Sequence, residues 1–181
     1  MKGIVFTEFL DMVEKKFGYV VVDEIISKSE LSSNGIYTAV GNYDHYEIIQ
    51  LLTNLSDNVK IDPQVLLTEF GKYIFDTLLE SYPQFFNSVD NSFDLLKSID
   101  NHIHVEVLKL YPDATLPSFD SEKREKDTMV MTYRSERKMA SFAQGLIEKS
   151  IEYYNEKCSI ELKKLNEEGS IVEFILKRER E

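Results

Sequence analysis

The chain has 181 residues, of which 43% are hydrophobic and 12% aromatic, and its formal net charge is −11. This content excludes a disordered chain and predicts one domain with a substantial core, while the negative charge argues against nucleic-acid and anionic-membrane partners. No run approaches the ~20 apolar residues of a membrane span. The N-terminal apolar run is too short for a signal peptide, so we expect a cytoplasmic protein.

The first 60 residues predict mainly helix, because apolar residues recur every three or four positions. The expected helices cover residues 5–17, residues 22–27 and a run that begins behind Tyr43 or Asp44. Gly18 is a typical stop signal for the first of them. The Ser-, Gly- and Asn-rich run 29–44 predicts a long, partly ordered connection.

A longer helix is expected between two prolines. Pro63 fits its first turn with Asp62 as the N-cap, and Pro83 ends it. Its apolar residues form one stripe, which consists of Val65, Leu66, Phe70, Ile74, Leu78 and Tyr82. This stripe predicts a face that packs on the core.

The next predicted helix carries two of the three histidines. It is expected to begin at an N-cap, Asn91 or Ser92, and to end near Tyr111. Steps of three and four along a helix place His104 on an apolar face and His102 on a face that mostly meets water.

The pattern around His104 is compatible with two roles. A histidine on an apolar face is more often a packed residue with one hydrogen bond than a ligand. A neutral imidazole in dry, aromatic surroundings is also what heme iron takes as an axial ligand. From its spacing alone, His104 is better explained as a packed core residue than as a heme ligand.

The pattern changes after Pro117. Three segments alternate apolar and polar residues and predict antiparallel strands, namely TMVMTYRS, CSIELKKL and SIVEFILKRE. Between the first two lies an amphipathic helix, ERKMASFAQGLIEKSIEYY, which Ser135 could cap. The prediction is an α+β class, with a helical N-terminal part packed on a C-terminal antiparallel sheet that a helix crosses. No flexible linker interrupts the chain, so residues 1–181 are expected to form one unit.

A second candidate site follows in TYRSER. If this stretch is extended, Tyr133, Ser135 and Arg137 point to one side and present two hydroxyls and a guanidinium, a set that suits carboxylate or phosphate oxygens. The alternative is a strand end with an N-cap serine and a surface arginine. A carboxylate-binding face together with His104 would suit a ligand with an apolar middle and an acidic edge, as heme has.

The chain resembles the H-NOX family, the heme nitric oxide/oxygen binding domains related to the heme domain of soluble guanylate cyclase. The resemblance covers essentially the whole chain, through MKGIVFTEFLDMVEKKFG, GIYTAVGNYDH, SIDNHIHVEVLKLYPDATLPSF and MTYRSERKMASFAQGLIE. It implies that His104 is the proximal ligand of the iron of heme b (iron protoporphyrin IX). It also implies that Tyr133, Ser135 and Arg137 hold the propionates, and that Pro117 presses on the porphyrin. The resemblance further implies a distal helical subdomain over residues 1–60 and a heme-ligating part over 61–181.

The resemblance also implies which residues line the distal pocket. Relatives that bind oxygen place a tyrosine where this chain has Phe142, and a polar residue where it has Ile74. The other apolar residues expected at the pocket are Leu78, Ile4 and Val5. A wall without a donor predicts a sensor of nitric oxide that also binds carbon monoxide and excludes oxygen, although these residues would fill an ordinary core equally well. A tyrosine such as Tyr43 or Tyr73 that reached the pocket would supply a hydrogen-bond donor and reverse this selectivity.

The expected output is regulation of another polypeptide, because the sequence contains no catalytic motif that we recognise. The resemblance implies a sensor histidine kinase, or a cyclic di-GMP synthase or phosphodiesterase. Release of His104 from iron, with relaxation of the heme against Pro117, is the implied mechanism, and the N-terminal helices are the expected output surface. The alternatives are a heme peroxidase, a heme-free binding module, and an oxygen or redox sensor. Cys158, the one cysteine, is expected to be an ordinary thiol.

Overall fold

The computed structural model describes residues 1–125 and 127–179, and the predicted bound at residue 181 therefore lies outside them. The fold is α+β, as predicted. The helices are α1 (Gly3–Phe17), α2 (Tyr19–Ser27), α3 (His45–Val59), α4 (Pro63–Ser81), α5 (Pro83–Asn87), α6 (Ser92–Ser98), the π-helix η1 (Ile99–Ile103), α7 (His104–Leu110) and α8 (Ala140–Tyr153). The strands are β1 (Ser118–Glu125), β2 (Thr128–Arg134), β3 (Cys158–Lys164) and β4 (Ile171–Arg178).

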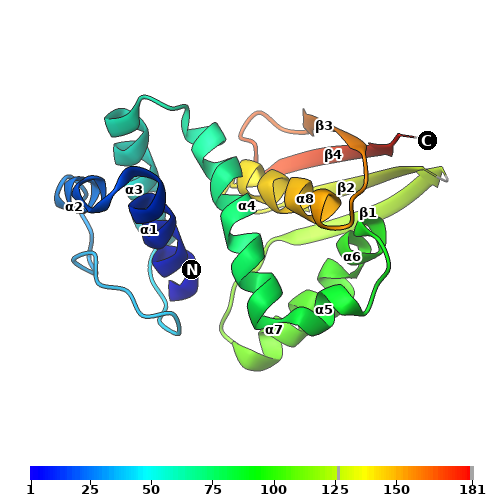
Figure 1. Ribbon diagram of the computed structural model, residues 1–181, viewed down its shortest axis with the longest axis horizontal. Helices are drawn as coiled ribbons and strands as arrows, with labels where there is room; N and C mark the ends of the chain where they lie inside the picture. The colour runs from blue at the N-terminus through cyan, green and yellow to red at the C-terminus, as the bar shows by residue number, and fades with distance from the viewer. Residues whose placement is uncertain (126, 180–181) are drawn as a thin grey trace.

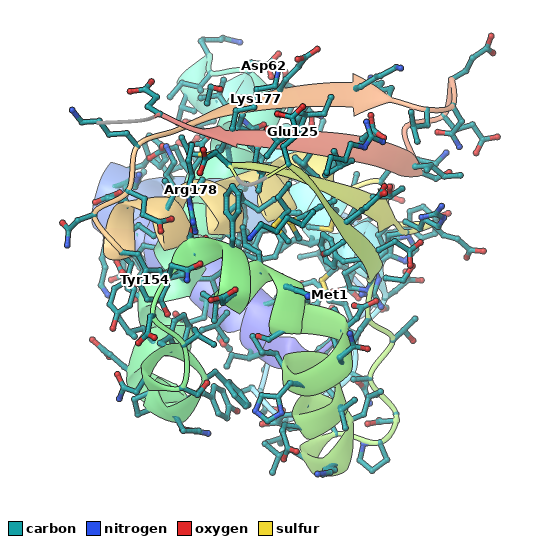
Figure 2. The ribbon with its side chains drawn as sticks, turned by 90° about the vertical axis from the view of Figure 1, so that its right-hand side faces the viewer. Met1, Asp62, Glu125, Tyr154, Lys177 and Arg178 are labelled. Atoms are coloured by element: carbon teal, nitrogen blue, oxygen red, sulfur yellow. The ribbon has the colours of Figure 1, made fainter. Side chains whose placement is uncertain are left out.

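The strands form one antiparallel sheet in the order β1-β2-β4-β3. Figure 1 shows α1, α2 and α3 on one side of α4, with α8 and the sheet on the other side. Seen from the side in Figure 2, the strands form an upper layer and the helices lie beneath them. The N-terminal helices are therefore separated from the sheet by α4 and α8.

Glycine and short polar side chains set the helix ends where the sequence predicts them. Gly18 adopts φ +89° and ends α1, a conformation that costs glycine little. The Asp44 side chain accepts a hydrogen bond from Tyr46 N (3.0 Å) at the start of α3, and Asp62 accepts one from Gln64 N (2.8 Å) at the start of α4.

Three helix boundaries differ from the prediction. The second helix begins at Tyr19 rather than at residue 22, because it follows Gly18 directly. Pro83 both ends α4 and starts the short helix α5, since a proline needs no N–H partner in a first turn. The prediction that Ser135 caps the following helix was wrong, because α8 begins only at Ala140.

Strand β1 is not among the three strands that the sequence predicts. Most of its side chains are exposed, so it lacks the apolar alternation that marks a half-buried strand. It lies at one edge of the sheet and pairs with β2, with Phe119 opposite Tyr133. Only pairing with the neighbouring strand defines such an edge strand.

The predicted histidine helix is interrupted. Asn91 caps α6, but the backbone N–H of His104 bonds to the carbonyl of Ile99, five residues earlier, so a π-turn separates α6 from α7. Such turns add a residue to one turn and are frequent at functional sites. The segment that carries His104 is therefore rotated relative to a continuous α-helix.

Helices α4 and α8 cross at a pair of glycines. A Cβ atom at Gly145 would lie 2.0 Å from the carbonyl oxygen of Thr68, and a Cβ atom at Gly71 would lie 2.1 Å from that of Phe142. Side chains at these positions would force the helices apart. One apolar cluster fills the space between the N-terminal helices and α4, and another lies between α8 and the sheet.

The connection between α2 and α3 is ordered around one buried carboxylate, Glu47. Its oxygens accept hydrogen bonds from the hydroxyls of Ser32, Ser33 and Tyr37 and from the backbone N–H of Ser33. Burial alone would raise the pKa of Glu47, but these four bonds outweigh it and hold the pKa below its ordinary value. The long connection is thus fixed by a side chain that lies outside it.

We expect Glu47→Ala to destabilise the protein by about 3 kcal/mol, because it removes the buried carboxylate that accepts four hydrogen bonds from the connection. The matched control is Glu30→Ala, a change at an exposed side chain in the same connection. The measurement is thermal unfolding, with a Tm that falls by roughly 6–12 °C for Glu47→Ala. Because the folded-state pKa is lowered, this contribution is present at neutral pH and is lost as pH falls through that lowered value. Equal Tm values for the two variants would contradict the assignment.

Candidate heme pocket

A cavity of about 360 Å³ lies between α4, the η1 and α7 segment, β2 and α8, and its walls are mostly apolar. All ten residues that the sequence analysis assigned to a binding site line it: Ile4, Val5, Ile74, Leu78, His104, Pro117, Tyr133, Ser135, Arg137 and Phe142. They come from segments more than 100 residues apart, and the fold brings them to one space.

His104 is the histidine that reaches this cavity. Its side chain is 18% exposed, and its Nδ1 atom lies 2.8 Å from Oδ1 of Asp100. Burial lowers the pKa of His104, and the Asp100 carboxylate opposes that shift. The imidazole is therefore neutral at pH 7, the form that binds iron.

His102 lies elsewhere, as predicted. It is exposed and does not line the cavity, and its ring packs edge-on at 5.6 Å against Phe85, which does. The two histidines thus have separate surroundings although one residue stands between them.

Tyr133, Ser135 and Arg137 line the cavity together, and the residues between them are exposed. The Tyr133 hydroxyl accepts a hydrogen bond from Met139 N (3.1 Å), and Arg137 Nη1 donates to the carbonyl oxygen of Thr115 (2.8 Å). Burial lowers the pKa of Arg137, yet a guanidinium stays protonated at neutral pH. The group presents one cation and two hydroxyls at a cavity whose walls are mostly apolar.

Lys2 and Asn42, from the segments before α1 and α3, also line this cavity, and neither was predicted from the sequence. The Lys2 ammonium lies 2.8 Å from Asp113 and above the ring of Tyr111, at 5.2 Å from its centre. Asn42 donates a second hydrogen bond to Asp113. These contacts join the N-terminal helices to the loop after α7, and no local sequence pattern indicates them.

The positions of the tyrosines determine whether a hydroxyl could donate a hydrogen bond to a gas molecule in the cavity. Tyr73 donates its hydroxyl hydrogen to Asp11, and the Tyr43 hydroxyl accepts from Thr38 N (2.8 Å), so both are engaged outside the cavity. Of the described tyrosines, three line the cavity: Tyr82, Tyr111 and Tyr133.

Tyr82 and Tyr111 line the cavity as neighbours. Burial raises the pKa of Tyr82, and a hydrogen bond with the Tyr111 hydroxyl adds to that effect. Tyr82 follows Ile74 by eight positions at the end of α4, which corresponds to about 12 Å along the axis. The wall formed by Ile74 and Phe142 therefore consists of carbon atoms.

The residues at the cavity fit a heme. His104 places one neutral imidazole at a mostly apolar cavity, and a single histidine suffices for an iron whose remaining ligands come from its own macrocycle. Within residues 1–125 and 127–179, no group of three or more His, Cys, Asp and Glu residues could hold a metal ion. The buried Oδ1 atom of Asp100 receives no aligned hydrogen bond from the described residues, which leaves it ready to fix a metal-bound imidazole. An apolar slot, one neutral histidine and a cationic edge define the site of a heme-binding protein.

Comparison with known proteins leads to the same class. A family model described as haem-NO-binding matches residues 2–162. An H-NOX protein from K. algicida, solved in its unliganded Fe(II) form, is 44% identical over 100% of this chain and 98% of its own, with a TM-score of 0.96. One from Shewanella woodyi, solved with IWP-051 in the Fe(II)CO state, is 40% identical over 99% of this chain and 95% of its own, with a TM-score of 0.84.

The chain belongs to the H-NOX family and is a heme-binding gas-sensor domain. An H-NOX protein from S. oneidensis in the Fe(II)NO state shares the fold, with a TM-score of 0.91 over 99% of this chain and 100% of its own at 23% identity. No curated protein matches the sequence. In the part of the chain that the structure describes, no helix has the length and apolar character to cross a membrane.

Proposed function

We propose that this domain binds heme b on His104, senses nitric oxide in preference to oxygen and regulates a separate signalling protein. One observation carries the proposal. His104 and the apolar side chains of Ile74 and Phe142 line the same cavity. The hydroxyls of Tyr133 and Ser135 and the guanidinium of Arg137 line it as well.

Selectivity follows from what the wall lacks. Ferrous heme held by one histidine offers an open coordination position, at which oxygen needs a hydrogen-bond donor from the protein and nitric oxide does not. Ile74 is buried and Phe142 half-buried, and neither side chain has a donor. Ile4 and Val5 extend the apolar surface from α1.

The proposed output is a movement of the segment that carries His104. The preceding helix α6 is fixed to the sheet, because Arg178 of strand β4 donates to Asn91 (2.7 Å) and lies 3.0 Å from Glu156. A released His104 would therefore move η1 and α7 while α6 stays in place. Pro117, on the loop between α7 and β1, lines the same cavity. Its contact with the heme would change when α7 moves.

The proposed partner is a sensor histidine kinase, or an enzyme that makes or breaks cyclic di-GMP. A net charge of −11 would steer this domain toward a basic surface on that partner. The coupling requires that the partner bind the two states of the domain with different affinities. Asp113 lies in the loop after α7 and contacts Lys2, which precedes α1. A movement of α7 would therefore be transmitted to the N-terminal helices through this contact.

Oxygen sensing is the second candidate function, because the Tyr82 and Tyr111 hydroxyls line the cavity. It requires one of them to act as a donor to the bound gas, and either Tyr82→Phe or Tyr111→Phe would then abolish oxygen binding. Thiol-based redox sensing is disfavoured, since burial raises the pKa of Cys158 to about 11 and leaves the thiol unreactive.

The experiment that tests the proposal is the absorption spectrum of the reduced, desalted protein exposed separately to air and to nitric oxide. We expect a five-coordinate ferrous spectrum that air leaves unchanged at first and that nitric oxide converts to a five-coordinate nitrosyl spectrum. A new stable spectrum in air would favour the oxygen sensor. Absence of any heme band would return His104 to the role of a packed core residue.

A further inference from the structure

Asp100 lies in the π-turn η1 and contacts two separate elements. Its Oδ1 atom is 2.8 Å from Nδ1 of His104, and its Oδ2 atom accepts a hydrogen bond from Phe119 N (2.8 Å) in strand β1. One carboxylate thus bridges the histidine segment and the edge strand, and each of its oxygens has a different neighbour.

The local geometry leaves this bridge incomplete. The Oδ1 atom is buried, and no aligned hydrogen bond reaches it within residues 1–125 and 127–179, although His104 Nδ1 is at hydrogen-bonding distance. An unpaired buried carboxylate oxygen is costly. A small rotation of the imidazole would point its N–H at Oδ1, and the opposite ring nitrogen, Nε2, would then carry the free lone pair.

We infer that Asp100 is a positioning residue for His104: its carboxylate fixes the Nδ1–H tautomer, turns Nε2 toward the cavity and joins the iron-ligating segment to strand β1. This inference rests on the proposed heme function. Carboxylates that accept the second N–H of a metal-bound histidine set the orientation of its ring and raise its basicity as a ligand. The contact with Phe119 N gives the carboxylate a fixed place, because β1 pairs with β2 along most of its length.

The substitution Asp100→Asn tests the inference with little change of volume. An asparagine has one acceptor oxygen, whereas two donors, His104 Nδ1–H and Phe119 N–H, converge on the native side chain. The amide therefore loses one of the two contacts and the negative charge. The matched control is Glu106→Gln, which removes a carboxylate from α7 that bonds only to Lys109 among the described residues.

Two measurements distinguish positioning from a merely structural role. Resonance Raman spectroscopy of the reduced protein gives the iron–histidine stretching frequency, and nitrogen NMR of the same protein without heme gives the tautomer that the protein alone imposes on His104. We expect Nδ1–H in the native sequence. For Asp100→Asn we expect a lower stretching frequency and roughly 10–100-fold weaker heme retention. Glu106→Gln should match the native protein in all three readouts.

Failure of this inference is separable from failure of the proposed function. A native protein without heme refutes the proposed function, and the His104 tautomer in that same protein still tests the contact with Asp100. An Nε2–H tautomer of His104 in the folded heme-free protein overturns the inference, even if Asp100→Asn does not fold. An unchanged stretching frequency in a folded, heme-loaded Asp100→Asn protein also overturns it.

Discussion

His104→Gly is expected to abolish heme retention in the purified protein, and added imidazole is expected to restore it. His104 is the described histidine at the cavity, and its removal leaves an apolar slot with no ligand for iron. Free imidazole fits the space that the side chain vacates, beside the carboxylate of Asp100. The measurement is the heme absorption band per protein after desalting, with and without imidazole.

The matched control for this variant is His102→Gly. His102 is exposed, packs on Phe85 and does not line the cavity, so its loss should leave the heme band unchanged. The imidazole-loaded His104→Gly protein also tests the output, because its heme ligand is no longer attached to α7. Nitric oxide should then fail to alter the activity of the partner. Unchanged regulation by nitric oxide in that protein would refute the proposed release of His104.

Phe142→Tyr is expected to raise oxygen affinity by roughly 30–150-fold, which corresponds to about 2–3 kcal/mol for a hydrogen bond to a charged acceptor. Phe142 lines the cavity on α8, and its ring packs at 5.1 Å from Phe70. A hydroxyl added here enters a wall that otherwise has no donor. Oxygen titration of the reduced protein, followed by absorbance, measures the change.

Phe119→Tyr is the matched control for this effect. It adds the same hydroxyl to the same cavity but on the His104 side, where the two ring centres are 6.1 Å apart. It should leave oxygen affinity unchanged, because the gas binds on the face opposite the histidine. If Phe142→Tyr and Phe119→Tyr have equal oxygen affinities, Phe142 does not lie on the gas-binding side and the selectivity argument fails.

The sequence by itself determined those features whose causes are local. Helix ends followed from Gly18, Asp44 and Asp62, because caps and stop signals act within a few residues. Periodicity separated the exposed His102 from the cavity-facing His104, since side chains two apart on a helix point in different directions. The resemblance to a known family then selected ten candidate residues, and the fold brings all of them to one cavity. Their roles in binding heme and gas stay predictions.

Only the tertiary structure decided the features that depend on contacts between distant segments. Strand β1 has mostly exposed side chains and is defined by its pairing with β2. Glu47 orders a connection that precedes it, and Lys2 contacts Asp113 more than 100 residues later. In the sequence, Asp100 is one acidic residue on an apolar helix face. Its contacts with His104 and Phe119 exist only because the π-turn η1 packs against the edge strand β1. Periodicity and capping report on neighbours along the chain, whereas a carboxylate shared between two elements depends on how those elements pack.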